Sequence, residues 1–169
     1  MNESGTAPEF WPFSLATYRR PGVEAACLVL QDEFGLDVNC LLFCCWAARA
    51  GFGRLNAEEL GAITQLARDW NAVVVAPLRQ VRRVLKDRVG PAPDGPVAAL
   101  RQAVKDVELE AEWHEQRMLA DLMTRAAAAP ISRDAAHANL DAYIAAVKGK
   151  RHPAMDAHLH TLVEAAFVN

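Results

Sequence analysis

The chain has 169 residues, which is enough for one domain and too few for two. Hydrophobic residues make up 52% of it and charged residues 23%, a balance that excludes intrinsic disorder and allows a buried core. The formal net charge is −3, so no overall positive field would attract nucleic acid or an anionic membrane surface. We therefore expect a single all-α domain over residues 1–169, in which residues 1–9 are flexible, because 32 alanines and 18 leucines favour helices.

Proline and glycine divide the N-terminal part of the chain into short helices. Pro12 is suited to the start of a first helix that ends at Arg20, and Pro21 opens a second helix whose apolar residues recur at steps of three and four. Asp37 is a good N-cap for a third helix that runs to Ala50. Because this third helix is apolar nearly all round, we place it at the centre of a bundle.

A fourth helical block runs from residue 57 to residue 88. Asn56 and Glu59 have the spacing of a capping box at its start. Asn71 and Pro77 predict a break or kink somewhere between them. The apolar run 73–75 is too short and too closely flanked by helical patterns to be a strand.

The C-terminal part of the chain begins with a loop rich in proline and glycine, residues 90–96. A long helix over 97–128 follows it, then helices over 132–147 and 155–167. The chain therefore predicts a bundle of six to seven helices with a long helical hairpin around the loop at 89–96.

The cysteines and the apolar stretches bear on the compartment. All four cysteines fall within apolar helical patterns, which is typical of buried thiols in a reducing cytoplasm. The N-terminus lacks the features of a signal peptide, and no apolar stretch reaches the roughly 20 residues that a membrane span requires. We expect a cytoplasmic protein that is not inserted in a membrane.

The long helix carries the densest polar segment, residues 104–117. Glu108, Glu112 and Glu115 fall in one row, for which a solvated face is the expected environment. His114 falls on the predicted apolar seam formed by residues 100, 104, 107, 111, 118 and 122, with Glu110 one turn before it as its expected partner. No second Glu-His pair accompanies them, so we expect no metal site.

A basic run at the end of the fourth block faces this acidic segment across the predicted hairpin. Folding about the loop brings Arg79 and Arg83 close to Lys105, Asp106 and Glu110. Internal pairing of the two charged strips is one interpretation, and an open docking or ligand site is the other. Nucleic-acid binding by the basic run is a third, less favoured possibility.

Aromatic residues gather at the N-terminus. Trp11 and Phe13, with Phe10 and Tyr18, either cover one end of the bundle or form a docking patch for another chain. The common nucleotide-binding, hydrolase and metalloprotease signatures are missing, which weighs against an enzyme, and we expect no cofactor.

Several N-terminal segments together resemble a known family: residues 10–15 (FWPFSL), Tyr18, 21–24 (PGVE), 27–28 (CL), 30–31 (LQ), 35–39 (GLDVN), 41–44 (LLFC) and Trp46. They resemble an uncharacterised proteobacterial domain-of-unknown-function family of small proteins of about this length. The similarity extends over residues 10 to 120. It implies a bacterial cytosolic protein and supplies neither an activity nor catalytic residues.

Two functions remain open for such a protein. The first is a non-enzymatic adaptor or regulatory subunit that binds a protein partner or a second copy of itself. The alternative is a small-molecule-binding protein or enzyme that uses a Glu/His/Arg cluster on the hairpin. The candidate interaction or ligand residues are Trp11, Phe13, Arg79, Arg83, Lys105, Glu108, Glu110, Glu112 and His114.

Overall fold

The computed structural model describes residues 9–88 and 95–168, which form a packed all-helical body with no strand among them. The helices are α1 (Phe10–Tyr18), α2 (Val23–Asp32), α3 (Val38–Arg49), α4 (Ala57–Trp70), α5 (Ala76–Lys86), α6 (Pro96–Asp121), α7 (Arg133–Lys148) and α8 (Asp156–Ala166). A π-helical turn, η1 (Asn71–Val75), joins α4 to α5, and a 3₁₀ turn, η2 (Pro153–Met155), leads into α8. Since α4, η1 and α5 run on without a gap, the described residues make seven helical rods, as the sequence predicts.

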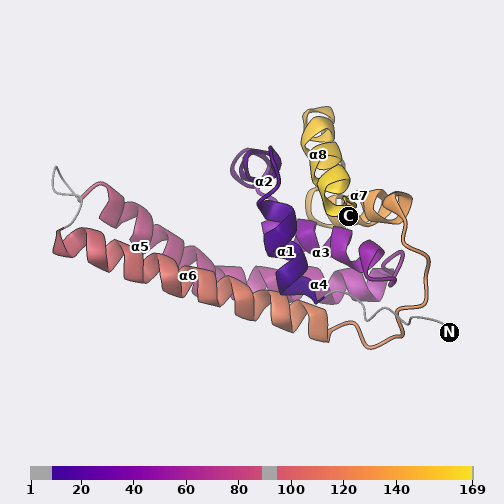
Figure 1. Cartoon of the computed structure of the whole chain (residues 1–169), viewed down its shortest axis with the longest axis horizontal. Helices are drawn as coiled ribbons and strands as arrows, with labels where there is room; N and C mark the ends of the chain where they lie inside the picture. The colour runs from indigo at the N-terminus through magenta and orange to yellow at the C-terminus, as the bar shows by residue number, and fades with distance from the viewer. Residues whose placement is uncertain (1–8, 89–94, 169) are drawn as a thin grey trace.

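The third helix lies at the centre of the bundle. Nine of its twelve residues are buried, and it packs against α1, α4, α6, α7 and α8 (Figure 1). The side chain of Asp37 caps it by accepting a hydrogen bond of 3.1 Å from the backbone N–H of Cys40. The predicted central position and the predicted N-cap are both confirmed.

The π-helical turn interrupts the long rod at the place that the sequence indicates. Pro77 has no N–H group and cannot donate to the carbonyl one turn before it, so an ordinary α-helical ladder cannot continue through this point. A π turn takes in an additional residue and changes which side chains of the next helix face inward. Residues 73–75 lie within this turn, so the rejection of a strand was correct. The capping box of Asn56 and Glu59 at the start of α4 is confirmed.

The two helices α5 and α6 form the predicted hairpin and extend together away from the other helices (Figure 1). The predicted end of the second helix at residue 128 is wrong, because α6 stops at Asp121. Tertiary contacts override the helix preference of the alanines that follow: the N–H of Ala129 donates to Gly51 at 2.7 Å, and Arg125 donates to Glu59 at 2.6 Å. The expected flexibility of residues 1–8 and the expected loop at 89–94 fall outside the described residues.

The inward face of α6 differs from the predicted seam. Leu100, Val107 and His114 are exposed, whereas Glu108 and Glu115 are buried. The predicted seam position of His114 is therefore wrong, and so is the predicted solvated row of glutamates. The physical reason is on the facing helix, where the inward side chains of α5 include arginines that pair with carboxylates.

All four cysteines are buried, as predicted. Burial raises the pKa of each thiol, that of Cys27 to about 12, so these thiols stay protonated at neutral pH. Among the residues that the structure describes, no helix has the length and apolar character needed to cross a membrane.

Candidate functional site

A polar cavity of about 240 Å³ lies where the base of the α5–α6 hairpin meets α1, α2 and the start of α3. Its apolar lining comes from Trp11, Leu15, Tyr18, Leu28, Val38, Leu42, Val75 and Leu109. Its polar lining comes from Ser14, Gln31, Asp37, Asn39, Asn71, Arg79, Arg82, Glu108, Glu112, Glu115 and Gln116. A second cavity of about 460 Å³ shares Gln31, Asp37, Asn71 and Arg79 with this one. We call the smaller space the polar cavity.

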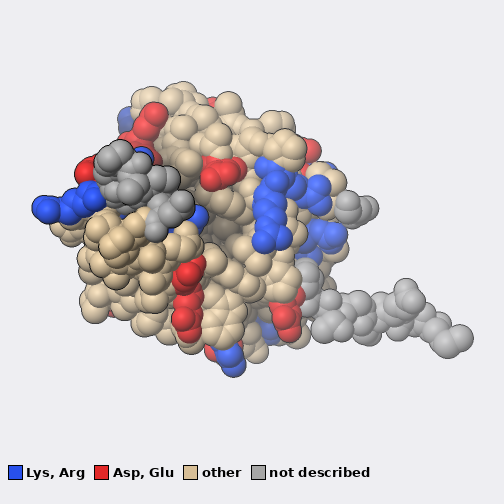
Figure 2. All heavy atoms as spheres, turned by 60° about the vertical axis from the view of Figure 1, so that its left-hand side comes forward, with Lys and Arg blue, Asp and Glu red and all other residues tan. Residues whose placement is uncertain are grey.

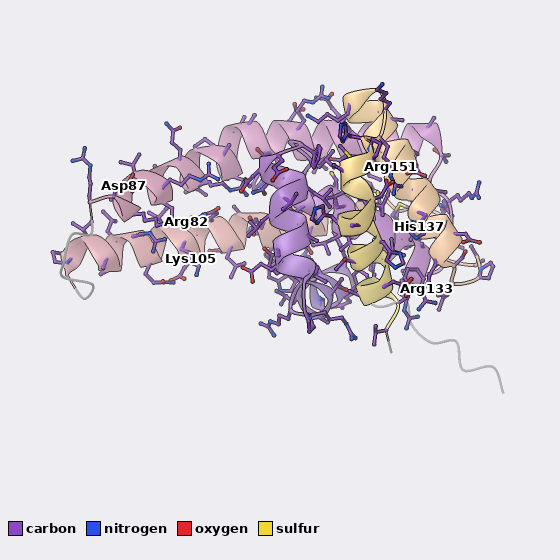
Figure 3. All side chains as sticks on the ribbon, turned by 90° about the horizontal axis from the view of Figure 1, so that it is seen from above. Arg82, Asp87, Lys105, Arg133, His137 and Arg151 are labelled. Carbon is purple, nitrogen blue, oxygen red and sulfur yellow. The ribbon has the colours of Figure 1, made fainter. Side chains whose placement is uncertain are left out.

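Two arginines of α5 hold two glutamates of α6 on the hairpin side of the polar cavity. Arg79 Nε donates to Glu108 Oε1 at 3.2 Å, and its Nη2 donates to Glu112 Oε1 at 3.4 Å. Arg82 also donates to Glu108, and Figure 3 shows Arg82 between the ribbons of α5 and α6. Although burial raises the pKa of Glu108, the hydrogen bonds and charges of Arg82 and Arg79 outweigh it and hold that pKa below its usual value. Glu108 is therefore a carboxylate at neutral pH.

A chain of amide hydrogen bonds lines the inner end of the polar cavity. Glu115 is completely buried, and its Oε2 accepts a hydrogen bond of 2.9 Å from Asn39 Nδ2. Gln116 Nε2 donates to Asn39 Oδ1 at 2.7 Å and to Ser14 Oγ at 2.8 Å. The other oxygens, Glu115 Oε1 and Gln116 Oε1, are buried and have no hydrogen-bond partner among the described residues. Every amide nitrogen named here donates, so Gln116 Oε1 is left over as an acceptor, and Glu115 Oε1 becomes one when its carboxyl is ionised.

Asp37 stands at the N-terminus of α3 and lines both cavities. Its second oxygen lies 3.4 Å from Asn71 Nδ2 in the π turn, and its backbone N–H donates to the hydroxyl of Tyr143 at 3.0 Å. Burial raises the pKa of Asp37, against the lowering effect of its hydrogen bonds and of Arg79. Asp37 thus links the centre of the bundle to η1 through its side chain and to α7 through its backbone.

Burial also raises the pKa of two glutamates of α6. The pKa of Glu115 rises to about 8 because the carboxyl is desolvated and lies near the negative charge of Asp37. Desolvation also raises the pKa of Glu112, although the positive charge of Arg79 lowers it in part. At neutral pH, Glu115 therefore retains its proton in most molecules.

Two of the four carboxyls around the polar cavity have no ion-pair partner. The ion pairs join the two guanidinium groups of the lining to Glu108 and Glu112. Asp37 and Glu115 have no cationic partner within ion-pair distance among residues 9–88 and 95–168. These two acidic groups, whose pKa values burial raises, are the distinguishing feature of this cavity.

The structure brings four of the nine candidate residues to the polar cavity: Trp11, Arg79, Glu108 and Glu112. The other charged candidates, Arg83, Lys105, Glu110 and His114, are exposed and do not line it. Phe13 packs against the hydrophobic core and borders a separate hollow near α8. The nine residues therefore do not form one site.

The predicted pairing of the two charged strips occurs, but between other residues than expected. Arg79 pairs with Glu108 and Glu112 and not with the predicted neighbours Lys105, Asp106 and Glu110. Arg83 faces α2 instead, 3.9 Å from Asp32. The π turn determines which residues of α5 face α6, and the inward face of α6 determines which carboxyls they meet. The spacing of the charges in the sequence shows neither feature.

Sequence reasoning missed Asp37, Asn39, Glu115 and Gln116 as site residues. The capping role alone accounts for Asp37 in the sequence, and helix spacing places Glu115 in a solvated row. The available signal is the spacing of Glu108, Glu112 and Glu115. Steps of four and three residues place all three carboxyls on one helix face, opposite the arginines of the facing helix.

The polar cavity does not have the arrangement of a metal centre. In the described part of the chain, no group of three or more His, Cys, Asp or Glu side chains is placed to hold a metal ion. The face in Figure 2 carries both acidic and basic side chains and is hollowed near its middle.

Comparison with known proteins gives a family for this chain but no activity. A family model described as "Protein of unknown function (DUF2390)" matches residues 9–119, a range that includes every residue that lines the polar cavity. Neither the curated proteins nor the solved structures contain a match to the chain. Because the model covers well over half of the 169 residues, the chain belongs to the DUF2390 family of proteins of unknown function.

Proposed function

We propose that this protein binds a small polar molecule in the polar cavity. The observation that carries the proposal is the buried carboxyl of Glu115, a residue of the cavity lining whose Oε1 has no partner among the described residues. An unpaired buried oxygen costs about 1–3 kcal/mol, so it is a feature that folding alone would not favour. A ligand that supplies a donor removes that cost.

The composition of the cavity supports the same function. Binding sites for small molecules combine apolar walls with a few polar groups that fix the orientation of the ligand. Here Trp11, Tyr18 and Leu28 supply walls, and the Glu115–Asn39–Gln116 chain supplies the fixed polar groups. No residue is yet assigned to a chemical step, so the proposal concerns binding.

The adaptor function has less support from the N-terminal aromatic residues. Phe10 is buried against Phe43 and Trp46, Phe13 packs on the core, and Trp11 lines the polar cavity. These side chains mainly cover the bundle, so they do not make a free docking patch. Binding of a protein partner through Trp11 and Phe13 stays a prediction, which Trp11→Ala in a pull-down would test.

A pair of leucine-to-tryptophan variants tests the proposed function. Leu28 lines the polar cavity and is 43% exposed, so Leu28→Trp adds bulk at the rim without opening the core. Leu100 is 54% exposed on α6 and does not line the cavity, which makes Leu100→Trp the matched control.

Binding is measured by saturation-transfer NMR with mixtures of small amines, carboxylates and polyols. We expect at least one class of compound to bind the wild type and Leu100→Trp, and to lose its signal with Leu28→Trp. If no compound distinguishes Leu28→Trp from the wild type, the polar cavity is not a binding site.

A further inference from the structure

We propose that the ligand of the polar cavity is a small organic ammonium ion, held by Glu115, Asp37 and the free oxygen of Gln116. This inference rests on the proposed function and names the chemical class of the ligand. It follows from the hydrogen-bond donors, the charges and the walls of the cavity.

The hydrogen-bond chain is short of donors. Asn39 donates to Glu115, and Gln116 donates to Asn39 and Ser14, which leaves Gln116 Oε1 as a buried acceptor and Glu115 Oε1 as a second one once its carboxyl is ionised. An ammonium group has three donors and no acceptor, so it complements such a site. A carboxylate or phosphate would add acceptors where acceptors are already in excess.

The charges favour the same ligand. Arg79 and Arg82 are engaged by Glu108 and Glu112, so they offer no free positive charge to an anion. Asp37 and Glu115 form no ion pair among the described residues, and Arg79, whose charge acts on both, is held by Glu108 and Glu112. A buried carboxylate is stable when it is paired with a cation, and a ligand of charge +1 or +2 would pair one or both of these groups.

The lining explains why an organic ammonium ion fits better than a metal ion. Trp11 and Tyr18 present aromatic surfaces that attract cations, and leucine and valine side chains line the same space. These walls suit a hydrocarbon body attached to the charged nitrogen. Hard metal ions need several oxygen ligands in one shell, and the described side chains form no such group.

We expect binding of an ammonium ion at Glu115 to depend on pH. The groups that face this carboxyl are Asp37 and Asn39 from the start of α3, Arg79 from α5, and Glu112 on α6 itself. Binding an ammonium ion at this carboxyl requires the carboxyl to lose its proton to solvent: the O–H bond of Glu115 breaks, and an ion pair with the ligand nitrogen replaces it. Affinity should therefore rise about tenfold per pH unit between pH 6 and 7 and level off above pH 8.

Three ammonium probes test the ligand class: n-butylamine, benzylamine and 1,4-diaminobutane. Their neutral and anionic counterparts are n-butanol, benzyl alcohol, butyrate and benzoate. Each is titrated into the whole ¹⁵N-labelled protein at pH 7.5, and the side-chain amide signals of Asn39 and Gln116 report binding at the site. We expect at least one ammonium probe to shift both signals saturably, and its alcohol and acid to bind at least tenfold more weakly.

A matched pair of glutamine variants locates the binding. Glu115→Gln removes the buried charge, whereas Glu110→Gln changes an exposed glutamate on the same helix. We expect Glu115→Gln to weaken the ammonium probe at least tenfold and Glu110→Gln to bind it as the wild type does. If Glu115→Gln does not fold, the comparison of charged and neutral probes on the wild type still decides the proposal.

The outcomes separate this inference from the proposed function. Saturable binding of an alcohol or an acid at the Asn39 and Gln116 signals, as tight as that of its amine, would overturn the ammonium class and leave the polar cavity as a ligand site. Failure of all seven probes would overturn the ammonium class as well, and the wider compound mixtures would then decide the proposed function.

Discussion

Glu115 places an ionisable carboxyl where solvent does not reach it, on the face of α6 that sequence periodicity assigns to solvent. Burial and the nearby charge of Asp37 raise its pKa from 4.5 to about 8. The folded protein therefore binds a proton that the unfolded chain releases above about pH 4.5. Between the two pKa values, each rise in pH favours the unfolded state.

The first prediction is a stability that falls as the pH rises. The contribution of the protonated Glu115 is fully present below about pH 4.5 and is lost by about pH 8. Urea denaturation at a series of pH values should show a decline over this window, with a smaller slope in Glu115→Gln. Some slope should remain in that variant, because the pKa values of Asp37 and Glu112 are also raised. Equal slopes in the wild type, Glu115→Gln and the exposed control Glu110→Gln would contradict the assignment.

Asn139 shows how a single polar side chain can hold three parts of the fold together. It is buried in α7, accepts from the N–H of Leu55 at 2.9 Å, and donates to the carbonyls of Cys44 at 3.2 Å and Gly53 at 3.0 Å. These bonds tie α7 to the end of α3 and to the segment before α4.

We therefore predict that Asn139→Ala lowers the free energy of unfolding by about 3 kcal/mol, since three buried backbone groups lose their partner. Urea denaturation at pH 6 measures the loss. The exposed Gln80→Ala on α5 should change the free energy by less than about 0.5 kcal/mol. A loss for Asn139→Ala as small as that of the control would show that the three bonds contribute little.

At the scale of the elements, η1 decides which side chains of α5 face α6. The sequence located the interruption between Asn71 and Pro77 but could not give its form. A pattern of 3.6 residues per turn carries no sign of one additional residue, and that residue rotates everything after it by about 100°. The partners of Arg79 therefore could not be counted from the loop.

Deleting Val73 should change this register. Val73 is 76% exposed within η1, so its removal takes away a residue of the turn without taking away core contacts. We expect α5 to rotate, the pairs of Arg79 and Arg82 with Glu108 to break, and the free energy of unfolding to fall by about 3 kcal/mol. Deletion of Asp87, at the end of α5, leaves the register before it intact and should cost far less. Equal stability of the two deletion variants would mean that the π turn does not set the pairing.

The segment after α6 is ordered by its contact with the turn that follows α3. Gly53 has φ +69°, and a Cβ added there would lie 2.8 Å from the Cβ of Ala129. Gly61, in α4, has nothing within 4 Å of an added Cβ. Replacement by alanine should therefore change the free energy of unfolding in opposite directions at these two glycines.

We predict that Gly53→Ala lowers the free energy of unfolding by about 1–2 kcal/mol through backbone strain and the close contact. Gly61→Ala should raise it by about 1 kcal/mol through helix propensity. Thermal unfolding of both variants gives the comparison. If Gly53→Ala were as stable as the wild type, the contact that ends α6 early would have to be looser than the structure shows.

Across the whole molecule, the α5–α6 hairpin projects from the rest of the bundle (Figure 1). The residues that line the polar cavity lie at its base and on the neighbouring helices. The sequence predicted the helices well, because their caps, breaks and periodic apolar positions are local features. It predicted the site poorly, because the inward face of α6 depends on the arginines of another helix. Glu108 and Glu115 looked solvated in a helix considered alone, and they became buried once α5 and α3 were placed beside them.

The family match includes the whole lining of the polar cavity but only part of the fold. It covers residues 9–119, from α1 to near the end of α6, and leaves α7 and α8 outside. The polar cavity lies within the matched range, whereas Tyr143 and Asn139, which support it and the central helix from α7, do not. The proteobacterial origin and the cytoplasmic location stay predictions from the sequence.

The measurement that tests the account most directly is the pKa of the Glu115 side chain, read from its carboxyl ¹³C chemical shift during a pH titration of the whole protein. A value near 8, which falls when an ammonium probe binds, would support a buried proton that a cationic ligand displaces. A value near 4.5, unchanged by the probe, would mean that Glu115 is solvated, and it would contradict both the inward face of α6 and the ligand site built on it.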